Sequence, residues 1–267
     1  MSGTGTGSGS GTAGPGDGTA APDGAPVAVV TGASRGLGAG LADALAGAGW
    51  RIGLCARTRP EVPEGAEAVA RAVDVVDAAA LEVFADEVVD RYGRIDLWVN
   101  NAGLLDPIGP LADADPAAVL RHVATNVGGV LLGTRVFARH VRDRPGGGVL
   151  VNVSSGAGTR PSQGWAAYCA SKAAVDMATE VVAMEEGAHG LRAYAVAPGV
   201  VDTDMQALIR STPAADFPSV ARFHQLFEEG AFNTPAWVAA FLLGLVDDPG
   251  AAAGEVRLRV PDQPPGS

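Results

Sequence analysis

A tyrosine and a lysine one helical turn apart are the residues of this sequence best suited to move a proton. Tyr168 and Lys172 open a helical pattern over 166–186, and residues four apart share one face of a helix. A phenol ordinarily keeps its proton up to about pH 10, whereas a neighbouring ammonium favours the phenolate and lowers its pKa. The pair is therefore predicted to donate and accept a proton near neutral pH. Surface helices also contain this spacing by chance, so the interpretation depends on the rest of the chain.

A glycine-rich turn offers a second chemistry, the binding of phosphate. Gly32, Gly36 and Gly38 lie between a short apolar run over 27–30 and a helical pattern that continues through Leu41 and Leu45. In a strand–turn–helix unit, glycines let the backbone approach a pyrophosphate, and the helix N-terminus supplies free N–H groups. The spacing differs from the Gly-x-Gly-x-x-Gly fingerprint of dinucleotide-binding folds, and a tight turn without a ligand is the alternative interpretation.

The end of the next apolar run indicates which dinucleotide would bind. The segment 51–56 is predicted to be a strand, and an acidic residue at its end would bind the free 2′-hydroxyl of NAD. Ala56 stands there instead, Arg57 follows it, and Arg35 in the glycine turn adds a second positive charge. Arginine suits the 2′-phosphate of NADP, so the sequence predicts NADPH as the coenzyme. The alternative is that Arg57 and Arg59 are solvated loop charges.

The remaining pattern alternates apolar runs with amphipathic segments. Strands are predicted over 27–30, 51–56, 68–73, 95–99, 149–153, 191–197 and 255–260, and helices between them include 77–92, a long helix from Pro116, and 235–246. This alternation predicts an α/β fold, a single Rossmann-like doubly wound parallel sheet of about seven strands with helices on both faces. The segment 202–234, rich in Phe and Pro, is predicted to be an irregular lid or binding loop.

The predicted domain spans 27–260. Residues 1–26 are Gly, Ser, Thr, Ala and Pro with few other types, and they are predicted to form a disordered tail because they cannot bury a core. Residues 261–267 are predicted to be a short C-terminal tail. No basic start or apolar middle marks a signal peptide, and no apolar run approaches the length of a membrane span, so a cytoplasmic protein without membrane contact is expected.

Charge and cysteine content exclude several classes of function. The net charge is −11 and the isoelectric point is about 4.7, which argues against a nucleic-acid surface because such a surface needs a basic patch. The two cysteines, Cys55 and Cys169, do not suggest a disulfide framework. The four histidines are scattered without metal-ligand spacing, so they are interpreted as ordinary surface or core residues and no metal is expected.

Polar residues follow several of the predicted strands. Asn100 and Asn101 come directly after 95–99, and Ser154 and Ser155 follow 149–153. The carboxyl ends of parallel strands meet at one edge of a sheet, where α/β folds bind ligands. Asn126 lies within an otherwise apolar helical pattern and needs hydrogen-bond partners, so it is either a buried structural amide or part of a site.

These motifs, taken in order, resemble those of the short-chain dehydrogenase/reductase family. The resemblance covers nearly all of 27–260 and rests on Thr31-Gly32-x-x-x-Gly36-x-Gly38, Asn100-Asn101-Ala102-Gly103, Asn126, Ser155, Tyr168-x-x-x-Lys172 and Pro198-Gly199. The active serine of this family lies thirteen residues before the tyrosine, which is the position of Ser155 and not of Ser154.

The resemblance implies a complete catalytic set: Asn126, Ser155, Tyr168 and Lys172. Tyr168 would be the general acid in reduction and the base in oxidation, and Ser155 would hydrogen-bond the substrate carbonyl. Lys172 would lower the pKa of Tyr168 and hold the nicotinamide ribose. Asn126 would hold a water that relays protons through Lys172.

The resemblance also implies a coenzyme site and an assembly. The coenzyme would contact Gly32, Ser34, Arg35, Gly36, Leu37, Gly38, Arg57, Thr58, Asp74, Val75, Asn101, Ala102, Gly103, Tyr168, Lys172, Pro198, Gly199, Val201 and Thr203. In this family the residue matched by Asp74 binds the adenine amino group, and 198–203 closes around the nicotinamide. Family members commonly pair through the helices that carry Asn126 and Tyr168, so a homodimer or homotetramer is expected.

The substrate is indicated by shorter similarities. Asp204-Met205-Gln206 and the stretch 223–235 resemble the sepiapterin reductase and benzil reductase branch, and the substrate site is predicted to contain Ser155, Trp165, Tyr168 and Met205. A pterin reductase would need an acidic anchor near the C-terminus, where Arg257 stands. The many aromatic side chains within 205–232 favour an apolar pocket.

We therefore predict an NADPH-dependent oxidoreductase that reduces a small-molecule ketone or α-dicarbonyl to an alcohol. The alternatives are an NAD-linked alcohol dehydrogenase on the same scaffold, a pterin reductase, and a dinucleotide-binding regulator without catalytic activity.

Overall fold

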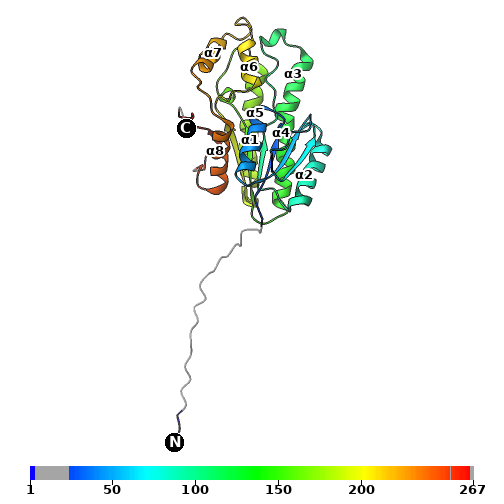
Figure 1. The fold of residues 1–267 in the computed structure, drawn as a ribbon, viewed down its shortest axis with the longest axis vertical. Helices are drawn as coiled ribbons and strands as arrows, with labels where there is room; N and C mark the ends of the chain where they lie inside the picture. Colours follow the sequence, from blue (N-terminus) through cyan, green and yellow to red (C-terminus); the bar gives the residue numbers. More distant parts are fainter. Residues whose placement is uncertain (4–23, 253, 265–267) are drawn as a thin grey trace.

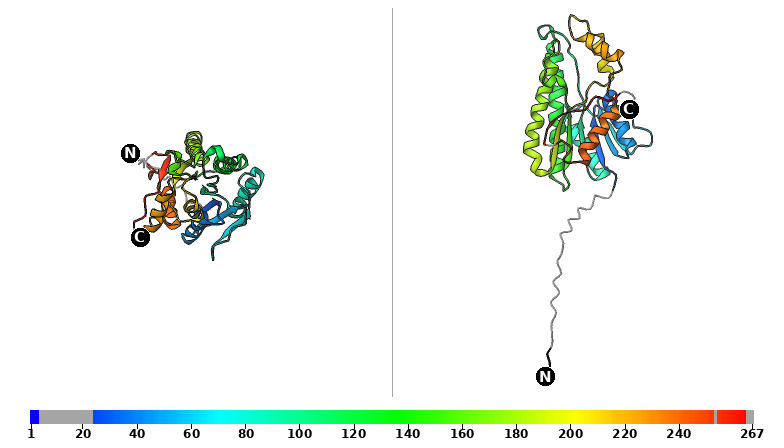
Figure 2. Two further views of the ribbon diagram at one scale, coloured as in Figure 1. Left: turned by 90° about the horizontal axis from the view of Figure 1, so that it is seen from above. Right: turned by 90° about the vertical axis from the view of Figure 1, so that its left-hand side faces the viewer.

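The computed structural model describes residues 1–3, 24–252 and 254–264, and its centre is one seven-stranded sheet. The strand order is β3-β2-β1-β4-β5-β6-β7, and every neighbouring pair is parallel. The strands are β1 (Val27–Thr31), β2 (Arg51–Ala56), β3 (Ala68–Ala72), β4 (Leu97–Asn100), β5 (Gly148–Val153), β6 (Leu191–Ala197) and β7 (Arg257–Arg259). Helices cover both faces of this sheet (Figures 1 and 2), so the predicted doubly wound α/β fold is confirmed.

Alternation along the strands divides the core into two layers. In β1, Ala28 and Val30 face the layer formed with α1 (Gly36–Gly47) and α8 (Pro235–Asp247). Val27 and Val29 face the layer formed with α2 (Ala78–Tyr92) and α4 (Gly129–Arg142). Successive strand residues point to opposite faces, so a strand that is apolar throughout must be covered on both sides. This burial is what holds the strand ends, and the residues beyond them, in register.

Several elements begin and end where the sequence pattern predicts. The bounds of β2, β6 and α5 (Ala166–Glu186) agree with the prediction. The helix α2 is capped as expected: the Asp77 carboxylate accepts the backbone N–H of Ala80 at 3.0 Å, and Gly93 ends the helix with a φ of 82°.

The long helix predicted from Pro116 is interrupted at Asn126. It consists of α3 (Pro116–Val123), a π-helical segment (Ala124–Gly128) and α4. A π-helical segment places an extra residue in the turn and changes which backbone groups are paired, and such segments are frequent at functional sites. The prediction of one regular helix was wrong at this point, because period-3.6 spacing does not reveal a local change of hydrogen-bond pattern.

The prediction of an irregular segment over 202–234 was also wrong. This part of the chain contains α6 (Asp204–Ser211) and α7 (Val220–Glu228), which lie together at one end of the molecule (Figure 1). Both helices are short, and each buries few residues, chiefly Ile209 and Val220. Short helices of this kind depend on tertiary packing, because isolated helices of this length are marginal in water.

The C-terminal end of the described chain packs on the domain, whereas most of the predicted N-terminal tail is not described. Residues 4–23, and with them most of the predicted N-terminal tail, lie outside the described residues. At the C-terminus, the Trp237 indole N–H donates to the Pro261 carbonyl at 2.9 Å, and the Gln263 backbone N–H donates to the Asn233 amide oxygen at 2.8 Å. Residues 261–263 therefore pack beside the start of α8.

Within the described ranges, no helix is long and apolar enough to cross a membrane.

Candidate active site

The predicted catalytic residues meet at the carboxyl edge of the sheet. Ser155 follows β5, Tyr168 and Lys172 occupy the first turns of α5, and Asn126 lies in the π-helical segment. Parallel strands end at the same edge, so residues far apart in the sequence are brought together by the register of β4, β5 and β6. That these four residues act together as a catalytic set stays a prediction.

Tyr168 presents a buried phenol to Ser155. The side chain is 8% exposed, and the Ser155 hydroxyl hydrogen-bonds it. Burial raises the pKa of Tyr168 above its ordinary value, and the hydrogen bond with Ser155 lowers it by a smaller amount. The Ser155 Oγ also accepts the backbone N–H of Ala157 at 3.2 Å, which fixes its position at the start of the following turn. With a raised pKa, the Tyr168 phenol keeps its proton at neutral pH.

Lys172 is a buried cation held by a backbone carbonyl. Its Nζ donates to the Val153 carbonyl at 2.8 Å and lies 5.6 Å from the centroid of the Tyr168 ring. Burial lowers the pKa of Lys172 to about 8, and the nearby Asp176 carboxylate opposes that shift. The sequence predicted that Lys172 lowers the pKa of Tyr168. Instead the pKa of the phenol is raised, because burial outweighs the effect of the ammonium, which donates to the Val153 carbonyl.

Asp176 is a second buried charge at this edge, and sequence reasoning missed it. It lies one helical turn beyond Lys172 on α5 and is 5% exposed. The Ser154 hydroxyl donates a short hydrogen bond to its carboxylate. Burial raises the pKa of Asp176, whereas Ser154, Arg257 and Lys172 lower it. The four-residue spacing of Lys172 and Asp176 on a buried helix face was a signal that could have identified it.

Asn126 is fastened to the loop that follows β4. Its Oδ1 accepts the Leu104 backbone N–H at 2.8 Å, and its Nδ2 donates to the Leu104 carbonyl at 2.8 Å. The same Nδ2 lies 3.0 Å from the Nε2 of His122, a fully buried histidine on α3. His122 was interpreted from the sequence as an ordinary surface or core residue. Its place beside the predicted catalytic residues becomes visible only in three dimensions.

The glycine turn has the shape of a phosphate-binding turn. Gly32 and Gly36 have φ values of 67° and 56°, in the left-handed region that favours glycine. A Cβ on Gly38 would lie 2.4 Å from the Gly32 carbonyl oxygen, so the turn admits no side chain there. The helix α1 begins at Gly36, and no side chain caps it. Its first N–H groups lack partners within the helix, which suits an anion.

Asn101 and Thr31 lock this turn to the end of β4. The Asn101 Nδ2 donates to the Thr31 carbonyl at 2.9 Å, and the backbone N–H groups of Asn101 and Ala102 donate to the Thr31 hydroxyl at 3.0 and 3.1 Å. A Cβ on Gly32 would lie 2.7 Å from the Ala102 Cα. The residues predicted to line a coenzyme channel therefore also hold the glycine turn in place.

The segment after β6 comes close to the same turn. A Cβ on Gly36 would lie 3.3 Å from the Thr203 Cγ2, which places Thr203 directly beside the glycine turn. Gly199 has a φ of 77°, and the Asn233 amide donates to the Pro198 carbonyl at 2.9 Å. Val201 is buried in the core layer of α1 and α8. The segment 198–203 thus spans from the sheet edge to the predicted phosphate site.

Positive charge is available at the end of β2. Arg57 is exposed, and it makes no hydrogen bond or ion pair with any residue that the structure describes. Arg35 pairs with Asp204 at 3.3 Å, but both side chains are largely exposed, so this pair is weak. The Arg59 guanidinium donates to the Ala70 carbonyl at 3.1 Å and is committed to the backbone of β3. Of the three arginines, Arg57 is the one free to meet a phosphate.

The other predicted coenzyme residues surround this region. Ser34 and Thr58 are exposed, Leu37 packs partly on the core, and Gly103 approaches the Asn126 side chain. Asp74 is exposed beyond β3 and accepts the Val76 backbone N–H at 3.2 Å, and Val75 is buried against Gly129. All of them lie along the carboxyl ends of β1 to β4.

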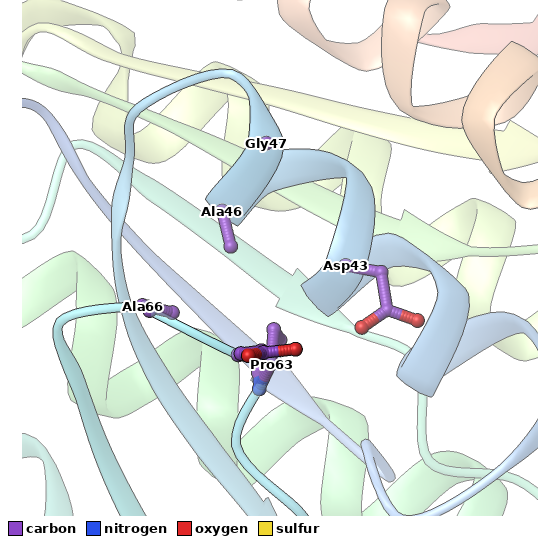
Figure 3. Close-up of a pocket in the computed structure, with 7 residues that line it drawn as sticks. Asp43, Ala46, Gly47, Pro63 and Ala66 are labelled. Carbon is purple, nitrogen blue, oxygen red and sulfur yellow. The ribbon is translucent and has the colours of Figure 1, made fainter.

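Two hollows lie between α1 and the segment 61–66, and Figure 3 shows the smaller one. Asp43, Pro63 and Glu64 line both, and the larger, of about 300 Å³, also reaches Ser34 in the glycine turn. Their carboxylates disfavour an anion there. The hollows border the predicted nucleotide region and lie away from Tyr168.

An aromatic cluster packs against Tyr168. The Trp165 ring stacks on Phe217 with centroids 4.5 Å apart and meets the Tyr168 ring edge-on at 5.5 Å. Phe223 and Met205, from α7 and α6, pack against the same cluster. The Trp165 indole N–H is buried and finds no hydrogen-bond partner within the part of the chain that is described. The predicted substrate residues are therefore brought together, with one unsatisfied donor among them.

Arg257 was predicted to stand where a pterin reductase would have an acidic anchor. It lies in β7 at the sheet edge and forms an ion pair with Glu180 of α5. This pair raises the pKa of Arg257, so the side chain is a permanent cation.

This chain is similar to several known proteins. The family model described as short chain dehydrogenase matches residues 26–214. The benzil reductase ((S)-benzoin forming) of Bacillus subtilis (strain 168) is 33% identical over 226 residues, which cover 82% of this chain and 92% of that protein. The benzil reductase ((S)-benzoin forming) of Bacillus cereus is 34% identical over 241 residues, with 85% and 96% covered. Among solved structures, an actinorhodin polyketide ketoreductase with NADPH matches with a TM-score of 0.75 and 31% identity, covering 88% of this chain and 95% of that one.

Proposed function

We propose a function from one premise: this chain belongs to the short-chain dehydrogenase/reductase family and is an NAD(P)-dependent oxidoreductase that acts on CH–OH or C=O groups. The proposed activity is the NADPH-dependent reduction of an apolar ketone or α-dicarbonyl to an alcohol. The observation that carries it is a buried Tyr168 phenol, hydrogen-bonded to Ser155 and faced by an aromatic cluster.

Each of the four proposed catalytic residues has its own role in transferring one proton. A bound nicotinamide coenzyme supplies the hydride. Tyr168 gives its phenolic proton to the carbonyl oxygen, and the Ser155 hydroxyl donates a hydrogen bond to the same oxygen as negative charge develops there. Lys172, with a pKa of about 8, is mainly cationic at neutral pH and stabilises the phenolate left behind. Asn126 holds the nearby loop and a water that returns the proton through Lys172.

NADP(H) is the proposed coenzyme. Arg57 is exposed and unengaged at the end of β2, where Ala56 leaves no carboxylate to bind a ribose hydroxyl. Arg35 can add a second contact, because its exposed pair with Asp204 costs little to break. The carboxylates of Asp43 and Glu64 in the hollows along α1 oppose this preference. Gly32, Gly36 and Gly38 would take the pyrophosphate on the N-terminus of α1.

The proposed substrate class follows from the cluster above Tyr168. Trp165, Phe217 and Phe223 offer aromatic surface, and apolar pockets with few polar groups select apolar ligands. The unsatisfied Trp165 N–H would serve the second oxygen of an α-dicarbonyl, since a buried donor without a partner is costly. Two relatives named as benzil reductases support this choice. A pterin is disfavoured, because the cation Arg257 stands where a pterin reductase would need an acidic anchor.

A homodimer or homotetramer is proposed from the outer face of α4 and α5. Leu131, Met177 and Met184 are exposed there, and Met184 is 85% exposed. A second copy packed on these helices would bury such exposed apolar side chains. We also propose a cytoplasmic location. The proposed domain spans 27–260, with a tail before it and a short tail after it.

The test compares variants in the full chain. NADPH oxidation is measured with benzil, sepiapterin, a simple ketone and a sugar, with NADH in parallel. Tyr168→Phe should lower turnover about 100-fold or more while NADPH binding, followed by fluorescence, is retained. Tyr92→Phe is the matched control, because Tyr92 is half-buried at the end of α2 and its hydroxyl accepts only from Arg91 among the described residues. Near-normal turnover in Tyr168→Phe, or no turnover by wild type with any carbonyl, would contradict the proposal.

A further inference from the structure

His122 connects three elements beside the catalytic residues. It lies on α3 and is fully buried. Its Nδ1 is 2.6 Å from the Asp106 carbonyl on the loop after β4, and its Nε2 is 3.1 Å from the Ser171 hydroxyl on α5. The Nε2 is also 3.0 Å from the Asn126 Nδ2, one turn along its own helix. Its ring meets the Tyr168 ring edge-on, with centroids 6.1 Å apart.

The partners determine which nitrogen carries the proton. The Asp106 carbonyl can only accept, so Nδ1 must be the donor. The Asn126 amide is oriented by Leu104, whose N–H donates to Oδ1 and whose carbonyl accepts from Nδ2. The second N–H of that amide points to His122 Nε2 at 3.0 Å, with the Ser171 hydroxyl farther away at 3.4 Å, so we assign Nε2 as its acceptor. The Ser171 hydroxyl donates to the Tyr168 carbonyl at 2.8 Å, so its oxygen lies beside Nε2 as an acceptor at 3.1 Å.

The neutral ring with hydrogen on Nδ1 satisfies the contacts with Asp106 and Asn126. Protonation of Nε2 would set an N–H against the amide N–H of Asn126. The charged groups that act on the ring are Lys172 on α5 and Asp106 on the loop. Burial is the main cause that lowers the pKa of His122, Lys172 lowers it further, and the contacts with Asp106 oppose the shift. The neutral form thus persists to lower pH than in a free histidine.

We propose that His122 is a positioning residue that sets Asn126 and the segment 104–106 against the catalytic face of α5. The inference rests on the proposed function, because Asn126 is assigned to the proton relay there. The segment 104–106 also carries Leu105, which packs in the same cluster as Tyr168 and Trp165. A displaced ring would therefore move both the relay residue and one wall of the substrate site, and small displacements of this kind are costly to turnover.

Variants of His122 separate its two contacts. His122→Gln keeps an acceptor for Asn126, His122→Asn keeps a donor for Asp106, and His122→Leu removes both. We expect His122→Leu to lower kcat about tenfold or more, with NADPH affinity changed less than about threefold. His122→Gln should recover most of kcat. Wild type should lose kcat as the pH falls and His122 becomes protonated, whereas His122→Gln should lack that acidic limb.

His140→Leu is the matched control. His140 is on α4, accepts the Ile95 backbone N–H at 3.0 Å, and has a pKa lowered by burial, but it lies away from the site. It should lower stability and leave kcat and its pH profile unchanged. The tautomer of His122 in wild type is read by ¹H–¹⁵N NMR, which needs no variant to fold.

Some outcomes would overturn the inference. They are hydrogen on Nε2 in the NMR spectrum, wild-type kcat and pH profile in His122→Leu, or an unchanged acidic limb in His122→Gln. If these appear while Tyr168→Phe is inactive, the inference fails alone. If Tyr168→Phe remains active, the proposed function fails instead.

Discussion

We expect the Lys172 ammonium of the nucleotide-free protein to titrate with a pKa of about 8, against an ordinary value of 10.5. Burial excludes water from this side chain, which is 7% exposed, and the Val153 carbonyl is its neutral hydrogen-bond partner. Lys172 is the only lysine in the sequence. Isotope-labelled lysine therefore gives a single side-chain NMR signal, and its titration measures this pKa directly.

The same shift predicts how stability changes with pH. Below about pH 8, Lys172 is protonated in both the folded and the unfolded state, so its contribution is constant. Between about 8 and 10.5 the folded state releases the proton while the unfolded state keeps it. The unfolded state then binds more protons, so stability rises with pH. The fall from 10.5 to about 8 corresponds to about 3 kcal/mol over the whole window.

Lys172→Met removes this titration and keeps a side chain of similar length. The free energy of unfolding is measured with urea for both proteins at fixed protein concentration, at about pH 7 and about pH 9.5. The wild type should gain about 2 kcal/mol relative to the variant between these two values. Subtracting the variant's change in unfolding free energy from that of wild type cancels the contribution of every group that titrates in the same way in both proteins. A pKa near 10.5 by NMR, or a difference between the two proteins that is independent of pH, would refute the reasoning.

Three further predictions concern the coenzyme, the substrate and the charges on α5. Wild type should prefer NADPH, and Ala56→Asp combined with Arg57→Ala should shift the preference in kcat/KM toward NADH; equal use of both by wild type would count against Arg57. Trp165→Phe keeps the stacking surface but removes the N–H, so it should lower kcat/KM for an α-dicarbonyl about tenfold relative to a monoketone, and an equal effect on both would argue against the second hydrogen bond. Asp176→Asn removes a carboxylate that raises the pKa of Lys172, so the NMR signal of labelled Lys172 should titrate at lower pH than in wild type, and an unchanged value would show that Asp176 does not act on it.

Much of the fold follows from local pattern. Apolar runs bounded by glycine or polar residues identify β2 and β6 to the residue, and the apolar face and length of α5 identify that helix. The spacing of Tyr168 and Lys172 and the positions of Ser155 and Asn101 after strands are enough to place them at one sheet edge. Such inferences succeed because backbone geometry alone relates residues within one element, and parallel pairing relates strand ends.

Other features depend on contacts that no local pattern contains. His122 and Ser171 are 49 positions apart, and Ser154 and Asp176 are 22 apart, yet each pair shares a hydrogen bond. The helices α6 and α7 form where the sequence suggested a loop, because Trp165 and Phe217 give their apolar residues a surface to cover.

The pKa of Tyr168 shows most clearly what the sequence determines and what the tertiary structure adds. The sequence determined that Tyr168 and Lys172 share a helix face, and it predicted a lowered pKa for the phenol from that proximity alone. The tertiary structure decided that the phenol is buried, so its pKa is raised, and that Lys172 bonds the Val153 carbonyl. A pKa depends on how much water the whole fold removes from a group and on which partners it brings, and both come from elements that are distant in the chain.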